Sequence, residues 1–132
     1  MTSPVNGLLQ ALHLAVKADA ALSAALGGEG LADRRQRGTR FPVLLPGAIE
    51  TRDFSTGDSK GHEILMVLEL WSEISRREAE ALASDLGRVA EALPAGIGAL
   101  RLVNLVQRGI TSRREAKTGL FVAEMRLRAV VE

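Results

Sequence analysis

Two segments of the sequence alternate between apolar and polar side chains, and this alternation restricts the fold more than any other feature. Residues 62–71 and residues 120–131 each carry one nearly continuous apolar face. Successive side chains of a β-strand point to opposite faces of a sheet, so each segment predicts a strand with one face in the core. The predicted core faces are His62, Ile64, Met66, Leu68 and Leu70 in the first strand, and Phe121, Ala123, Met125, Leu127, Ala129 and Val131 in the second.

The other faces of these two strands are mixed in character. The first strand carries Glu63, Leu65, Val67, Glu69 and Trp71 there. Such a face predicts partial cover by a helix or by a neighbouring subunit, because a face open to water is normally polar. The second strand carries Glu124, Arg126 and Arg128 on its other face, which predicts a charged surface.

The first 28 residues predict helical structure. Ser3 is a favourable N-cap residue with Pro4 in the first turn, and apolar residues then recur at helical spacing. Asp19 predicts the cap of a short continuation, which the pair Gly27 and Gly28 ends.

A further helix is predicted by the run from Ser75 to Glu78. This run has the capping-box pattern, in which Ser75 accepts from the backbone N–H of Glu78 and the Glu78 side chain reaches back to the N–H of Ser75. The predicted buried stripe is Ala79, Leu82, Ala83, Leu86, Val89, Ala90 and Leu93.

Two more strands are expected, at residues 41–52 and 100–107, with polar turns at 53–61 and 109–118. The short connections between successive strands predict hairpins. The predicted fold is therefore α+β, a mostly antiparallel four-stranded sheet with helices packed on one face, in a single domain over residues 1–132.

Composition excludes several function classes. Seventeen basic and sixteen acidic residues give a net charge of +1, too balanced for tight binding of nucleic acid by one copy. The chain has no cysteine and only two histidines, His13 and His62, so no metal or cofactor is expected. No apolar run reaches the length of a membrane span, and the first residues lack a secretory signal, which predicts a soluble protein in the cytoplasm.

No catalytic pattern stands out either. The sequence has no phosphate-binding loop of the Gly-x-x-x-x-Gly-Lys kind, and neither histidine has a nucleophile beside it in sequence. We expect no catalytic residues and no enzymatic activity.

A basic segment at residues 29–40 contains Arg34, Arg35, Arg37 and Arg40. It has two interpretations: a solvated connection, or a surface that faces a partner protein or passing DNA. Charge alone does not decide between them.

Several short runs resemble the tail-completion, or tail-terminator, family of long-tailed phages and gene transfer agents. They are Phe41-Pro42, Asp53-Phe54-Ser55-Thr56, Gly61-His62-Glu63, Leu70-Trp71-Ser72, Arg77-Glu78-Ala79, Leu93, Gly119-Leu120-Phe121 and Arg126-Leu127-Arg128-Ala129-Val130. The resemblance implies a structural protein that forms a ring, usually of six copies. Such a ring sits on the last tail-tube ring, presents a docking face to the head–tail connector and lets DNA pass as cargo through its lumen, after assembly in the cytoplasm.

A ring needs two different complementary faces on each subunit, because a cyclic head-to-tail contact is heterologous. We predict that either the face with Leu65, Val67 and Trp71 or the face with Glu124, Arg126 and Arg128 contacts a neighbour. Two alternatives stay open: a head–tail stopper or other neck protein, and a small cytoplasmic ligand-binding domain with a site at Asp53, His62 and Glu63.

Overall fold

The computed structural model describes residues 3–33 and 40–132, so the predicted loop residues Arg34, Arg35 and Arg37 lie outside the described residues. Within these described residues, three helices and five strands follow in chain order. They are α1 (Pro4–Ala18), α2 (Ala20–Ala25), β1 (Val43–Asp53), β2 (His62–Ser72), α3 (Arg76–Glu91), β3 (Gly96–Ile97), β4 (Leu100–Arg114) and β5 (Phe121–Val131).

The strands form one antiparallel sheet in the order β1-β2-β5-β4-β3. The predicted α+β class and the antiparallel pairing are confirmed, but the sheet has five strands within the described residues and not four. The added strand β3 is only two residues long and pairs with Leu100 and Arg101. Two residues are too few for alternation to show, so no sequence pattern indicates it.

Strand β4 is also longer than predicted, because residues 109–114 continue the strand and the turn is confined to 115–120. The polar residues of this stretch are paired with β5, for example Thr111 with Glu124 and Arg113 with Val122. Strand propensity depends on the neighbouring strand and on burial, so a polar strand with a paired partner is easily mistaken for a turn.

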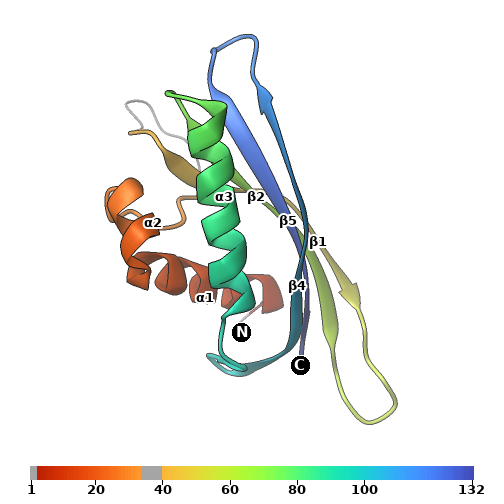
Figure 1. The fold of residues 1–132 in the computed structure, drawn as a ribbon. Coiled ribbons are helices and arrows are strands. Elements are labelled where there is room, and N and C mark those ends of the chain that lie inside the picture. The colour runs from red at the N-terminus through yellow and green to blue at the C-terminus, as the bar shows by residue number, and fades with distance from the viewer. Residues whose placement is uncertain (1–2, 34–39) are drawn as a thin grey trace.

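All three helices lie on one face of the twisted sheet, as Figure 1 shows. Helix α3 packs on β4, β5 and β2, while α1 packs against α2 and α3. The predicted apolar faces of β2 and β5 meet this helical layer: Ile64, Met66, Leu68, Leu70, Ala123, Met125, Leu127, Ala129 and Val131 are all buried. The core therefore lies between the sheet and the helices.

The predicted helix caps form. Ser3 Oγ accepts from the N–H of Asn6 at 2.9 Å, and Asp19 accepts from the N–H of Leu22 at 3.1 Å. Ser75 Oγ accepts from the N–H of Glu78 at 3.0 Å.

The second hydrogen bond of the predicted capping box, from the N–H of Ser75 to the Glu78 side chain, is replaced by bonds to Ser72. The Glu78 side chain accepts from Ser72 Oγ at 2.7 Å, and the N–H groups of Ile74 and Ser75 donate to the same Ser72 oxygen at 3.1 and 3.3 Å. The fully buried Ser72 hydroxyl thus fixes the corner between β2 and α3.

The two hairpin loops project from opposite ends of the sheet (Figure 1). Residues 54–61 connect β1 with β2 at one end, and residues 115–120 connect β4 with β5 at the other. The register confirms this arrangement, since Asp53 pairs with His62 at the first end and Arg114 pairs with Phe121 at the second.

The segment after α2 is attached to the rest of the fold. The N–H of Leu31 donates to Nδ1 of His13 on α1 at 3.1 Å, and Leu31 forms a parallel bridge with Leu44. His13 therefore has a structural partner on a segment 18 residues away along the chain.

Candidate functional site

The sheet face opposite the helices brings the two predicted contact groups together. Strands β2 and β5 are neighbours, and Leu65 pairs with Arg128 while Val67 pairs with Arg126. Directly opposed residues of antiparallel strands point to the same side of a sheet. The predicted contact residues consequently occupy one surface, which we call the outer face, whereas the sequence predicted them on two alternative faces. They are Leu65, Val67, Trp71, Glu124, Arg126 and Arg128.

The centre of the outer face is hollowed into a groove of about 400 Å³ between β1 and β4. Its lining includes Leu65, Val67, Glu50, Arg108 and Arg126. Register irregularities border it on both sides, between Pro46 and Ile49 in β1 and between Gln107 and Gly109 in β4. The groove combines an apolar floor with charged walls, the composition of a protein contact surface.

Glycine at position 109 makes room for one wall of this groove. Its φ is +150°, and a Cβ built there would lie 2.8 Å from Nη2 of Arg126. Arg126 Nη1 also donates to Oγ1 of Thr111 at 3.1 Å. The Arg126 guanidinium is thus held against β4, close to the groove.

One edge of the outer face is organised by a nearly buried carboxylate, Glu63, which is 9% exposed. Its Oε2 accepts from Nε of Arg128 at 2.6 Å, and its Oε1 lies 2.8 Å from Nη2 of Arg52. The Arg128 guanidinium also lies over the Phe54 ring, 5.6 Å from its centroid. The hydrogen bond from Arg128, followed by the charges of both arginines, holds the pKa of Glu63 below its usual value.

The opposite edge of the outer face has a small apolar cluster. Trp71 is 8% exposed and packs with Val43, Leu45 and Val122, and Phe41 and Leu120 lie against them. Trp71 Nε1 donates to Oε1 of Glu69 at 3.1 Å. Most of the Trp71 surface is therefore covered by its own chain, a fact that the alternation of β2 could not reveal.

Two carboxylates stand directly opposite each other between these edges, Glu69 on β2 and Glu124 on β5. Like charges at such positions repel, and each carboxylate has its own partner. Glu69 accepts from Trp71, while Glu124 lies 3.7 Å from Nε of Arg113. Four of the six predicted contact residues, Trp71, Glu124, Arg126 and Arg128, are thus engaged within the chain.

The residues proposed for a ligand site at the hairpin base are also engaged. Asp53 Oδ1 accepts from the N–H of Ser55 at 2.9 Å, and hydrogen bonds from Ser55 hold the Asp53 pKa below its usual value. Both oxygens of Glu63 contact arginines. This geometry favours a structural role for Asp53 and Glu63 over acid–base chemistry.

Residues 3–33 and 40–132 contain no group of three or more histidine, aspartate or glutamate side chains placed to hold a metal ion. No helix in this part of the chain has both the length and the apolarity of a membrane span.

The predicted loop residue Arg40 is exposed, and its guanidinium lies beside Gly27, where a built Cβ would be 3.3 Å from Nη1. It is the only one of the four loop arginines that the structure describes.

Comparison with known proteins agrees with the resemblance noted in the sequence. The fold is similar to a chain of a solved structure described as the virion of a native gene transfer agent (GTA) particle, with a TM-score of 0.80, 26% sequence identity and 99% of each chain covered. No curated protein matches the sequence. Residues 10–132 match the family described as Tail completion protein gp17, and the chain therefore belongs to that family.

Proposed function

We propose that this protein is the tail terminator of a phage-like particle or gene transfer agent, a structural subunit that forms a ring at the end of the tail tube. The family match over residues 10–132 carries this proposal. The likeness to a chain of a gene transfer agent virion over 99% of both chains supports the same location in the particle. In this role a ring of six copies joins the tail tube to the connector, and DNA passes through the ring only as cargo.

The outer face is our proposal for one of the two surfaces that close the ring. The helices cover one face of the sheet and no helix of the described residues covers the other (Figure 1). Leu65, Val67 and Arg126 are half-buried in the single chain and line the central groove, so a second copy could bury them fully. In this proposal Trp71, Glu124 and Arg128 maintain the shape of the surface through their contacts within the chain.

The tail-tube protein and the head–tail connector are the proposed partners along the particle axis. The segment with Arg34, Arg35, Arg37 and Arg40 is the proposed loop that faces a partner protein or the passing DNA, because identical loops repeated around a ring would multiply a modest positive charge. Assembly would take place in the cytoplasm before the protein enters the particle.

Native mass spectrometry of the purified protein, with and without the tail-tube protein of the same particle, tests the proposal. We expect closed rings, either in free solution or only in the presence of tubes, and electron microscopy should find them at a tube end. A protein that stays monomeric and does not bind tubes would contradict the terminator role.

A further inference from the structure

One end of the molecule carries several basic side chains without acidic partners. This end is built from residues 72–77 and 113–120, which contain five basic residues and two acidic residues. Arg76, Arg77, Arg114 and Lys117 are exposed, and none of them forms an ion pair within the described part of the chain. These four basic side chains are therefore not neutralised by ion pairs within the described part of the subunit.

The opposite end of the sheet is different. Arg52 and Arg128 both contact Glu63, and Arg101 contacts Glu132. Each of these three arginines has a carboxylate of the same chain as its partner. Lys60 in the hairpin loop is also exposed at this end and forms no ion pair in the described residues, so the two ends differ in the number of unpaired basic side chains.

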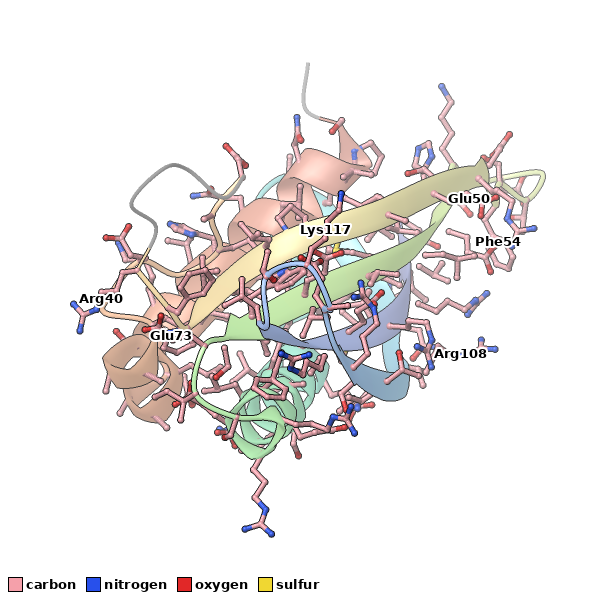
Figure 2. All side chains as sticks on the ribbon, turned by 90° about the horizontal axis from the view of Figure 1, so that it is seen from above. Arg40, Glu50, Phe54, Glu73, Arg108 and Lys117 are labelled. Carbon is pink, nitrogen blue, oxygen red and sulfur yellow. The ribbon has the colours of Figure 1, made fainter. Side chains whose placement is uncertain are left out.

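The basic residues come from two segments that the fold holds side by side. Ser112 Oγ near the end of β4 donates to Oε1 of Glu80 on α3 at 2.7 Å. Arg77 lies one turn before Glu80 on the same side of α3, and Arg114 follows Ser112 by two residues along β4. Figure 2, which views the molecule from above, shows Lys117 on the loop beyond β4, away from Glu50 and Phe54.

An exposed apolar residue lies within this basic group. Ile74 is 70% exposed, more than the other exposed large apolar residues Leu14, Phe54, Val103 and Val106. It lies in the β2–α3 corner that Ser72 fixes, since the N–H of Ile74 donates to Ser72 Oγ. The side chain is thus presented on a rigid corner directly before Arg76 and Arg77.

We propose that Ile74, Arg76, Arg77, Arg114 and Lys117, here called the basic end, form a docking surface for another protein of the particle. The partner surface would have an apolar pocket for Ile74 and acidic side chains around it. This inference rests on the proposed function, because the ring would repeat the basic end once per subunit at one rim.

A protein partner fits these residues better than DNA does. Phosphate contacts need basic residues alone, and the exposed isoleucine beside Arg76 and Arg77 adds nothing to them. Burial of an apolar side chain surrounded by charges is instead the usual anatomy of a protein interface. The basic end also has no aromatic residue for stacking on bases.

The test uses the full chain and three purified probes: the tail-tube protein, the head–tail connector protein and a short duplex DNA. The R76E/R77E double variant reverses the charge at these two positions, and I74S removes the apolar contact. K17E/K60E is the matched control, because Lys17 and Lys60 are exposed, lie outside the basic end and give the same change in net charge. New acidic residues in the first turn of α3 favour the helix, so R76E/R77E should keep its thermal stability.

We expect R76E/R77E and I74S each to weaken binding to one of the two proteins by about tenfold, with K17E/K60E close to the unchanged protein. Only R76E/R77E should also reduce the salt dependence of binding. If the unchanged chain binds one of the two proteins and all variants bind that protein equally well, the docking role of the basic end is wrong while the proposed function stands. If the variants lose binding to DNA but keep binding to both proteins, the basic end is a nucleic-acid surface and the protein-docking role is wrong. If the unchanged chain binds neither protein, the proposed function and this inference both fail.

Discussion

Arg128 donates from Nε to Oε2 of Glu63 at 2.6 Å, diagonally across β5 and β2, and this bond fixes the edge of the outer face beside the first hairpin. The same carboxylate lies 2.8 Å from Arg52 of β1 through its other oxygen. One glutamate therefore joins three strands. Its charge is retained near the protein surface because two guanidinium groups replace the water that burial removes.

The first prediction concerns the pH dependence of stability at Glu63. Its folded-state pKa is lower than the usual 4.5, so ionised Glu63 stabilises the fold above that value. The stabilisation should disappear as the pH falls from about 4.5 through the lower folded-state pKa. Urea denaturation at a series of pH values should show a steeper acid loss for the unchanged protein than for Glu63→Gln. Parallel curves for the two proteins would refute the assignment.

The second prediction concerns Ser72 at the β2–α3 corner. Ser72→Ala leaves the N–H groups of Ile74 and Ser75 without their acceptor and Glu78 without its donor. We expect a loss of about 2 kcal/mol in the free energy of unfolding. Ser75→Ala removes a single capping bond and should cost about 1 kcal/mol. Chemical denaturation of both variants would test this order, which the reverse ranking would contradict.

A third prediction separates folding from assembly at Trp71. Because Trp71 is 8% exposed and packed with Val43, Leu45 and Val122, Trp71→Ala should lower the free energy of unfolding by about 3 kcal/mol. Any loss of rings in this variant should follow its loss of folded protein. Thermal denaturation of the monomer, compared with ring yield, measures both. Normal stability with absent rings would instead make Trp71 a contact residue.

The fourth prediction tests the groove on the outer face. Val67 is half-buried, so Val67→Ser should change monomer stability by about 1 kcal/mol or less while raising the concentration needed for ring formation by about tenfold. Val103→Ser is the control, because Val103 is 47% exposed and does not line the groove. Analytical ultracentrifugation over a concentration series measures the effect. Similar assembly by both variants would exclude the groove from the ring contact.

Much of the local structure could be predicted from the sequence. Ser3, Asp19 and Ser75 cap the predicted helices, since each cap depends on a side chain and a backbone N–H three residues further along the chain. The alternation in β2 and β5 also predicted the core faces correctly apart from the first residues, His62 and Phe121, which are only half-buried, because the period of two follows from strand geometry alone. The runs that resemble the tail-completion family predicted the match over residues 10–132.

The tertiary structure decided which residues from distant segments of the chain become neighbours. The sequence predicted two separate candidate faces, but the pairing of Leu65 with Arg128 makes them one surface, and pairing depends on which strands become neighbours. The cover over Trp71, the partners of Glu63 and the two-residue strand β3 likewise arise from contacts between distant segments. The sequence by itself determined the helices, their caps and the core strands β2 and β5, because those features depend on neighbours along the chain, whereas β3 and residues 109–114 of β4 depend on pairing with a distant strand. Only the fold could decide which polar residues neutralise each other and which remain free for a partner.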